Sequence, residues 1–265
     1  MPTIFPSNEL ILNDPPWLKS TRKYKMGLKP IPEDNWITIN PSQEVISHKE
    51  HLLANRYHDV VAVTENSILS QQALSDLIGI SSTEHYPDPI AGVASKVAED
   101  LCILDTSDNN RFIAGCVCSP SYWNLKEKIG HPLWGVHEAV DGLNDYLGLN
   151  IDRFIQGLSL KRPFQRENWF IHGNDQRMHL TPEADLPPTP ETWFIRTERE
   201  TLCRIHEDYI VFTINPRFVP LAAIFDFPDA ARSLQEVLEG FTKDEVIYFG
   251  GQSKLDLLKE FLNSH

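Results

Sequence analysis

Charged side chains follow an apolar run near position 195, and their types and spacing suggest chemistry. The apolar residues 193–195 lead directly into residues 196–201, which read Arg-Thr-Glu-Arg-Glu-Thr. On a β-strand, Arg196 and Glu198 share one face and Arg199 lies on the other. A polar cluster of this kind could point into a pocket, where Glu198 could hold a cation by charge-assisted hydrogen bonds. The alternative is a solvated strand edge with cross-strand ion pairs.

Ten histidines are scattered along the chain, and His137 is the one whose surroundings suggest a ligand. It lies within the apolar, helix-like residues 133–140. A neutral imidazole on an apolar wall suits haem iron, although a lone histidine there can also be structural. His131, which precedes Pro132 at a break in the helical pattern, is interpreted as a turn residue.

The remaining motifs exclude several kinds of site. The chain has no GxGxxG, GxxxxGK[ST], HExxH, GxSxG or CxxC sequence, which argues against nucleotide loops, zinc proteases, serine hydrolases and thiolate zinc sites. Cys116 and Cys118 would share one face of a strand, where they could bind a soft metal together. We interpret them instead as two small residues buried in a sheet core.

Composition limits the partners and the compartment. The 24 Lys+Arg and 37 Asp+Glu give a formal net charge of −13, a field that repels phosphate and argues against a nucleic-acid partner. The four cysteines form no dense disulfide framework, and the N-terminus lacks a signal-peptide pattern. The most apolar long window, 209–227, is interrupted by Pro216, Arg217 and Pro220, so no membrane association is expected and we predict a cytoplasmic location.

The elements that must position these residues change in kind along the chain. We expect an extended arm over 1–45 with a short strand at 36–39, and helices at 42–57, 67–78 and 89–99. Strands at 100–105 and 111–118 read as a hairpin, and a helical insert follows over 122–160. The rest is predicted as strands at 168–172, 192–199, 202–205 and 209–214, and then helices with a capping box formed by Thr242 and Glu245.

Strands that do not alternate with helices favour an α+β fold, with an antiparallel sheet and helices packed to one side. Two strands, several short helices and a three-strand meander are also the element order of a PAS domain. We therefore predict a PAS-like antiparallel sheet with a helical N-terminal extension and C-terminal helices. The corresponding segments are 1–87, 88–228 and 229–265, which together form one compact domain.

Several short segments carry a resemblance to a known family. In chain order they are MGLKP (26–30), AEDLC (98–102), AGCVCSPSYW (114–123), LKEKIGHPL (125–133) followed by Val136-His137, RENW (166–169), RTERETL (196–202) and IVFTI (210–214). Together they resemble the haem-dependent oxidative N-demethylases, the family of the α subunit of dimethylamine monooxygenase. The chain departs from the family pattern at 138–142, 203–206 and 214–217, so the resemblance defines the cofactor better than the substrate.

The resemblance implies a haem-binding PAS-like subunit, with haem b in the core over 88–228. It implies oxidative N-demethylation of a small, dimethylamine-like alkylamine by O₂. Electrons would come from a separate NADPH reductase, with FMN and a [2Fe–2S] cluster on partner subunits only. The alternative is a haem-binding PAS-type sensor or regulatory protein without turnover, because a fold does not fix a function.

The resemblance also implies roles for individual residues. His137 would be the proximal ligand of the haem iron. Three residues would lie near the distal pocket or the haem propionates as catalytic candidates: Arg196, Glu198 and Arg199. Three more would contact the cofactor: Lys29, Trp123 and Phe194.

Overall fold

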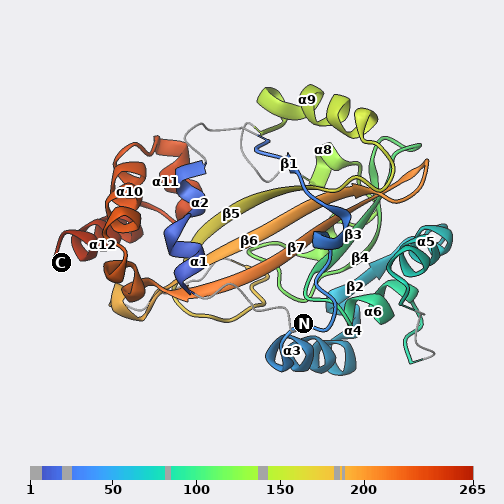
Figure 1. Cartoon of the computed structure of the whole chain (residues 1–265), viewed down its shortest axis with the longest axis horizontal. Helices are drawn as coiled ribbons and strands as arrows, with labels where there is room; N and C mark the ends of the chain where they lie inside the picture. Colours follow the sequence, from blue (N-terminus) through green and yellow to red (C-terminus); the bar gives the residue numbers. More distant parts are fainter. Residues whose placement is uncertain are drawn as a thin grey trace.

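A seven-stranded antiparallel sheet forms the centre of the computed structural model, which describes residues 8–19, 26–80, 85–136, 143–181, 186 and 189–264. The strand order is β1-β5-β6-β7-β3-β4-β2 (Figure 1). The strands are β1 (Lys29–Pro30), β2 (Val61–Val63), β3 (Asp100–Asp105), β4 (Arg111–Cys116), β5 (Phe164–His172), β6 (Phe194–Arg204) and β7 (Tyr209–Pro220). The predicted α+β class and antiparallel sheet are confirmed; the likeness to a PAS domain stays a prediction.

The predicted hairpin is present as β3 and β4, and β5, β6 and β7 form a meander longer than expected. β7 continues through Pro216, although proline usually ends a central strand. It can do so because β3 pairs with β7 only as far as Ile214, so the last part of β7 has β6 as its one paired neighbour. Proline is tolerated where one strand edge needs no ladder hydrogen bond.

The predicted strand at 36–39 is wrong. The arm instead forms a short 3₁₀ turn, η1 (Glu33–Asn35), followed by an isolated bridge between Ile39 and Val97. The side chain of Trp36 is buried and donates from Nε1 to Thr201 Oγ1 at 2.9 Å, so tertiary contacts fix this segment in place of a strand ladder.

The helices of the first half are α1 (Asn8–Asn13), α2 (Pro16–Lys19), α3 (Gln43–Asn55), α4 (Tyr57–Val60), α5 (Ile68–Ile78) and α6 (Pro89–Ala94). Ser42 is the N-cap of α3, as predicted. α5 ends at Gly79, whose φ of 71° is the left-handed conformation that glycine adopts without strain. α6 is shorter than predicted because it ends at Ala94, and residues 96–98 bond instead to the N-terminal arm, through the Ile39–Val97 bridge and a hydrogen bond from Ala98 N–H to the carbonyl of Thr38.

The helical insert between β4 and β5 contains α7 (Leu125–Lys128), α8 (Leu133–Val136) and α9 (Leu143–Gly157). The chain ends in α10 (Pro228–Glu239), α11 (Lys243–Phe249) and α12 (Gln252–Asn263), which gather at one end of the sheet (Figure 1). The predicted capping box of Thr242 and Glu245 begins α11. No helix in the described part of the chain has the length and apolar character to cross a membrane.

Helices cover both faces of the sheet, which differs from the predicted one-sided packing. Leu101 and Ile103 of β3 pack with α3 to α6, whereas Cys102 and Leu104 pack with the insert. Both sets of alternating side chains are apolar, so each face needs a cover. We call the face that packs with α3 to α6 the Arg199 face and the face that packs with the insert the Arg196 face, after the β6 residues that point to them. A third core joins α1, α2, α10 and α12 to the far end of the Arg199 face.

Candidate functional site

The middle of β6 carries polar side chains on both faces of the sheet, as the strand alternation predicts. Arg196 lies opposite Phe170 of β5 and Phe218 of β7, and Glu198 lies on the same face. Arg199 points to the other face. The structure therefore brings Arg196 and Glu198 together and places Arg199 in a separate cluster.

Arg196 is fully buried, and its guanidinium is held on several sides. Nε donates to Glu198 Oε1 at 2.9 Å, and Nη2 is 2.8 Å from the same oxygen. Nη1 donates to the carbonyl of Arg177 at 3.1 Å, and Nη2 donates to the carbonyl of Ser119 at 2.5 Å. The guanidinium also stacks over Phe218, 5.5 Å from the ring centroid. Arg196 thus ties two loops to β6 and orients Glu198.

Two buried carboxylates lie next to each other on this face. Burial raises the pKa of Glu198, and the charge of Arg196 opposes that rise. Arg196 binds only Oε1 of Glu198, so the second oxygen has no hydrogen bond among the described residues. Glu200 is paired through both oxygens, with Arg166 and with Asn168 Nδ2 at 3.5 Å. The two carboxylates therefore form one ion pair each, and one oxygen of Glu198 stays open.

A group of aromatic rings that sequence reasoning missed adjoins Arg196. His172 is fully buried, stacks on Tyr122 at 4.9 Å between centroids and lies edge-on to His179 at 4.9 Å. Burial, and then the charge of Arg196, lowers the pKa of His172 to about 2, so the imidazole is neutral. Tyr122 has a φ of 63°, a strained conformation for an aromatic residue. Tyr122 lies 50 positions before His172 and 57 before His179, so no local spacing could reveal its contact with the two histidines.

Tyr248 of α11 is a further residue near this site that no sequence motif predicted. Its ring lies 6.3 Å from that of Phe170 on the Arg196 face. Tyr248 is 58% exposed, and its partial desolvation, followed by the charges of Glu198 and Glu200, raises its pKa. A C-terminal helix therefore reaches the surroundings of the two carboxylates.

An apolar wall continues the Arg196 face beneath the insert. Trp123, Phe164, Phe212 and Leu133 are half-buried there and pack on the core that contains Leu202. Of the predicted haem contacts, Trp123 lies in this wall. Phe194 is half-buried and lies opposite His172 in the strand register. Lys29 is exposed on the edge strand β1, opposite Gln165. His137 lies outside the described residues.

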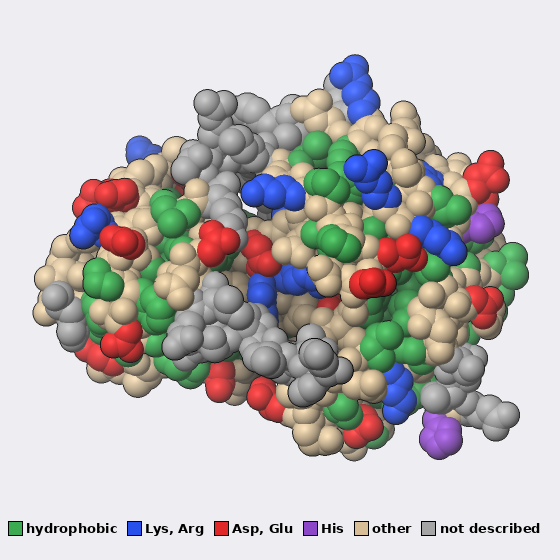
Figure 2. All heavy atoms as spheres, in the orientation of Figure 1, with side chains coloured by type: hydrophobic (Ala, Val, Ile, Leu, Met, Phe, Trp, Pro, Cys, Tyr) green, Lys and Arg blue, Asp and Glu red, His purple; other side chains and the backbone are tan. Residues whose placement is uncertain are grey.

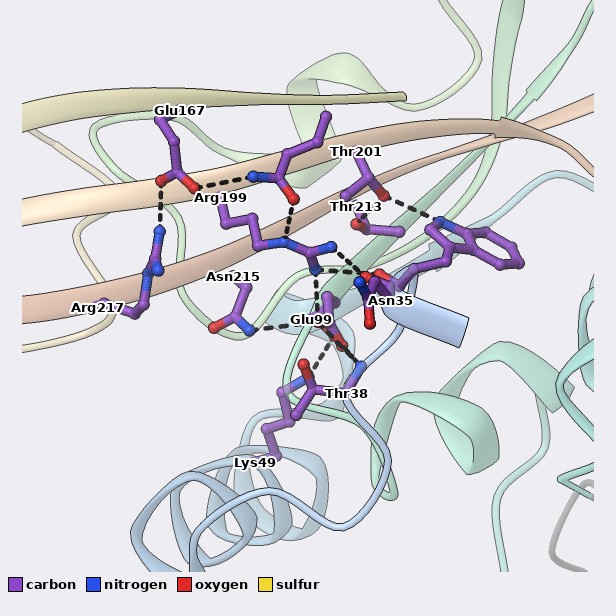
Figure 3. A network of polar contacts seen from close by, with 12 residues as sticks. Asn35, Thr38, Lys49, Glu99, Glu167, Arg199, Thr201, Thr213, Asn215 and Arg217 are labelled. Carbon is purple, nitrogen blue, oxygen red and sulfur yellow. Dashed lines mark hydrogen bonds and ion pairs between the residues drawn. The ribbon is translucent and has the colours of Figure 1, made fainter. Parts of the chain in front are cut away.

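Arg199 belongs to a network on the opposite face (Figure 3). It donates from Nε to Gln165 Oε1 at 2.6 Å, from Nη1 to the carbonyl of Trp36 at 3.1 Å and from Nη2 to the carbonyl of Asn35. Its Nη1 is 3.6 Å from Glu99 Oε1, and Glu99 is fully buried. Burial lowers the pKa of Arg199 and Glu99 opposes this. The contacts with Asn35 and Trp36 fasten the N-terminal arm to β6.

The same network extends to further groups of both charges. Glu99 accepts hydrogen bonds from the backbone N–H of Thr38 at 3.1 Å and from Asn215 Nδ2 at 3.2 Å. Arg217 and Glu167 form an ion pair beside it. Figure 2 shows that the surface is hollowed near the middle of the molecule, where basic and acidic side chains lie close together. Within the described residues, the arginines of this network are already engaged by protein oxygens.

Cys116 and Cys118 are free thiols buried in the core with α3 to α6. A hydrogen bond with Cys116, and then burial, raises the pKa of Cys118. The thiol of Cys118 is therefore neutral, and both side chains are packed in the way that a structural role requires.

Comparison with known proteins gives the family. Residues 42–256 match the family model described as "Haem-dependent oxidative N-demethylase, alpha subunit-like". No curated protein matches the chain. The match covers most of the sequence, including the insert, the meander and the Arg196–Glu198 pair. The chain therefore belongs to the haem-dependent oxidative N-demethylase, alpha subunit-like, family.

Proposed function

We propose that the chain is the haem-carrying subunit of an oxygenase that removes a methyl group from a small alkylamine such as dimethylamine. The observation that carries the proposal is the open oxygen of Glu198, a buried carboxylate that Arg196 orients on the same face of the sheet as an apolar wall. The balanced reaction joins dimethylamine, O₂, two electrons and two protons, and it releases methylamine, formaldehyde and water. The chain would supply the amine site and the proton-carrying groups.

The described residues of the Arg196 face fit a haem group in two respects. The half-buried rings of Trp123, Phe164 and Phe212 offer an apolar surface of the kind that a porphyrin needs. Arg166, whose side chain is 36% exposed, offers a cation that can meet a propionate. We propose b-type haem with His137 of the insert as the iron ligand and with Trp123 and Phe194 as contacts. Lys29, which pairs with Gln165, lies on the Arg199 face and is no longer proposed as a contact. When bound, haem supplies the O₂ chemistry.

Glu198 is the residue suited to hold the amine. An alkylammonium N–H would donate to its open oxygen, and such a charge-assisted hydrogen bond is strong where water is excluded. The phenyl ring of Phe170 and the phenol of Tyr248 lie nearby and can contact methyl groups or a cation. Because burial raises its pKa, Glu198 also takes up a proton more readily than an exposed glutamate. It can therefore accept the proton that the bound ammonium gives up.

Electrons must reach the subunit from elsewhere. The sequence contains no flavin or nicotinamide fingerprint, and its formal net charge is −13. We propose a separate NADPH reductase, with FMN and [2Fe–2S] on partner subunits, that docks through a basic surface. The four buried, free cysteines fit a reducing compartment such as the cytoplasm.

The first test is an absorption spectrum of the purified chain after incubation with hemin. We expect a Soret band that is lost in His137→Ala and kept in His131→Ala, whose histidine is exposed beside α8. Loss of the band in His131→Ala or His172→Ala, with the band kept in His137→Ala, would overturn the ligand assignment.

The second test supplies chemical or enzymatic electrons to the haem-loaded chain and measures formaldehyde across a panel of methylated amines. We expect O₂-dependent formaldehyde from a small secondary or tertiary amine. If haem binds but no amine shifts its spectrum and none yields formaldehyde, the demethylase proposal fails and the regulatory alternative replaces it.

A further inference from the structure

Cys118 and Ser119, which follow β4 after Val117, are hydrogen bonded at all four of their backbone polar atoms. The N–H groups of Cys118 and Ser119 donate to Asp100 Oδ1 and Oδ2, at 3.0 and 2.7 Å. The carbonyl of Cys118 accepts from His48 Nε2 at 2.8 Å. The carbonyl of Ser119 accepts from Arg196 Nη2 at 2.5 Å. This pair of residues is therefore a fixed connector between Asp100 and Arg196.

Asp100 is itself held from the N-terminal extension. It is fully buried at the start of β3, and Lys49 Nζ of α3 lies 3.8 Å from its Oδ1. Lys49 is also buried, and it donates to the carbonyls of Glu99 at 2.5 Å and Ala94 at 3.3 Å. A continuous set of contacts thus runs from α3 through Asp100 and residues 118–119 to Arg196.

We propose that Asp100 is a positioning residue for the Arg196–Glu198 pair, supported by His48 and Lys49 of α3. Ser119 provides one of the two carbonyls that fix the guanidinium of Arg196. If residues 118–119 shift, Arg196 loses that acceptor and turns away from Glu198. The second oxygen of Glu198 then no longer points to a fixed place. The importance of this for catalysis rests on the proposed function, but the positioning itself does not.

The chemistry at Asp100 explains why a carboxylate is needed there. Two parallel N–H donors require two acceptor oxygens, and a carboxylate supplies both. In Asp100→Asn, the amide N–H₂ would face one of the backbone N–H groups, and Lys49 would lose its counter-charge. A buried donor without an acceptor is costly, so residues 118–119 would move to find another partner.

The test measures hydrogen exchange at the Nε–H of Arg196 by NMR on arginine-labelled chain, with the signal assigned through Arg196→Lys. The backbone N–H of Val211, a fully buried residue of β7 between β3 and β6, reports global opening. In Asp100→Asn we expect exchange at Arg196 to become at least about tenfold faster relative to Val211, the effect of losing one charge-assisted hydrogen bond.

Glu99→Gln is the matched control. Glu99 is the neighbouring residue and is equally buried, but it binds Thr38, Asn215 and Arg199 on the opposite face. We expect it to lower stability and to leave the ratio of the two exchange rates unchanged. An unchanged ratio in folded Asp100→Asn, or an equal rise in Glu99→Gln, would overturn the proposal.

If Asp100→Asn does not fold, a second pair of variants decides alone. His48→Ala removes the donor to the carbonyl of Cys118, whereas His51 is exposed on the same helix and contacts only Asn55 among the described residues. We expect the ratio of the exchange rate at Arg196 to that at Val211 to rise in His48→Ala and to stay unchanged in His51→Ala. Equal ratios in the two variants would reject the positioning role. These measurements need neither haem nor amine, so their failure is distinct from a failed formaldehyde assay.

Discussion

Arg196 and Arg199 are three positions apart, and the alternation of β6 sends them to opposite faces of the sheet. That separation could be predicted from the sequence, because a strand has a side-chain period of two. The partners of Arg196 could not, because the carbonyls of Ser119 and Arg177 come from remote loops. A guanidinium held in this way orients Glu198 instead of moving freely in the site. The residue best placed to meet a ligand on this face is therefore Glu198.

Glu198→Gln should weaken amine binding by about 1.5–3 kcal/mol and leave the haem content unchanged, because an amide forms a weaker hydrogen bond to an ammonium than a carboxylate does. Glu200→Gln is the matched control, since both oxygens of Glu200 already have protein partners. The measurement is a titration of the haem spectrum with the amine. Equal losses in the two variants would show that the open oxygen of Glu198 is not the contact.

His172 predicts a specific acid sensitivity. Its pKa is lowered from 6.5 to about 2 in the folded chain, so between these values the unfolded chain binds a proton that the folded chain does not. The free energy of unfolding should therefore fall as the pH drops below 6.5, by at most about 1.4 kcal/mol per pH unit from this residue.

Urea unfolding of wild type and His172→Gln between pH 7 and pH 4.5 measures this contribution as a difference in slope. We expect a shallower fall in His172→Gln and an unchanged fall in His51→Gln, whose histidine is exposed. A parallel fall in wild type and His172→Gln would mean that His172 is protonated in the folded chain.

At the scale of the elements, local signals predicted the β3–β4 hairpin, the N-cap of α3 and the capping box of α11. The break expected in β6 near Glu200 and Thr201 is absent. Two polar residues looked like a loop, but Glu200 pairs with Arg166 and Thr201 Oγ1 lies 2.7 Å from Thr213 Oγ1. Cross-strand partners keep such residues in a strand, and a single strand's sequence does not reveal them.

Gly115 shows how closely the insert approaches the sheet. A Cβ there would lie 2.7 Å from a ring carbon of Phe112 and 2.8 Å from a methyl carbon of Leu125 in α7. Both neighbours are 2% exposed and have little room to move. Gly115→Ala should therefore destabilise the chain by about 1–3 kcal/mol and displace α7, with lower haem uptake as a consequence.

Gly157→Ala, at the end of α9, is the control for that change, because no atom beyond its chain neighbours and its own helix backbone lies within 4 Å of the added Cβ. We expect it to be neutral or to stabilise by about 0.4–1 kcal/mol. Urea unfolding and the Soret absorbance per mole of chain measure the two effects. Normal stability and haem uptake in Gly115→Ala would show that α7 can shift without affecting the site.

Across the whole molecule, the Arg199 face joins parts of the chain that are far apart in sequence. Its two apolar cores lie on either side of the polar network of Arg199, Glu99 and Asn215. The network also holds the N-terminal arm through Asn35, Trp36 and Thr38. The position of Arg199 in a polar stretch could be predicted, but its pairing with Glu99 and the arm could not, because that pairing requires the folded positions of β3, β6, β7 and the arm together.

The last prediction separates a structural role of Arg199 from a catalytic one. Arg199→Met removes the cation beside buried Glu99 and three hydrogen bonds to the arm and Gln165. We expect a loss of about 3–5 kcal/mol in the free energy of unfolding, because one partner of a buried pair is left uncompensated. Hydrogen exchange should rise selectively over residues 26–40. Adding Glu99→Gln should recover part of the loss, with a coupling of about 1–3 kcal/mol, since the lone buried charge is then also removed.

Haem content per folded chain should stay normal, because Arg199 points away from the apolar wall that contains Trp123. If Arg199→Met instead abolished haem binding or amine binding while the arm stayed protected, the residue would belong to the catalytic site as the family resemblance implies, and the two faces of the sheet would have to act together.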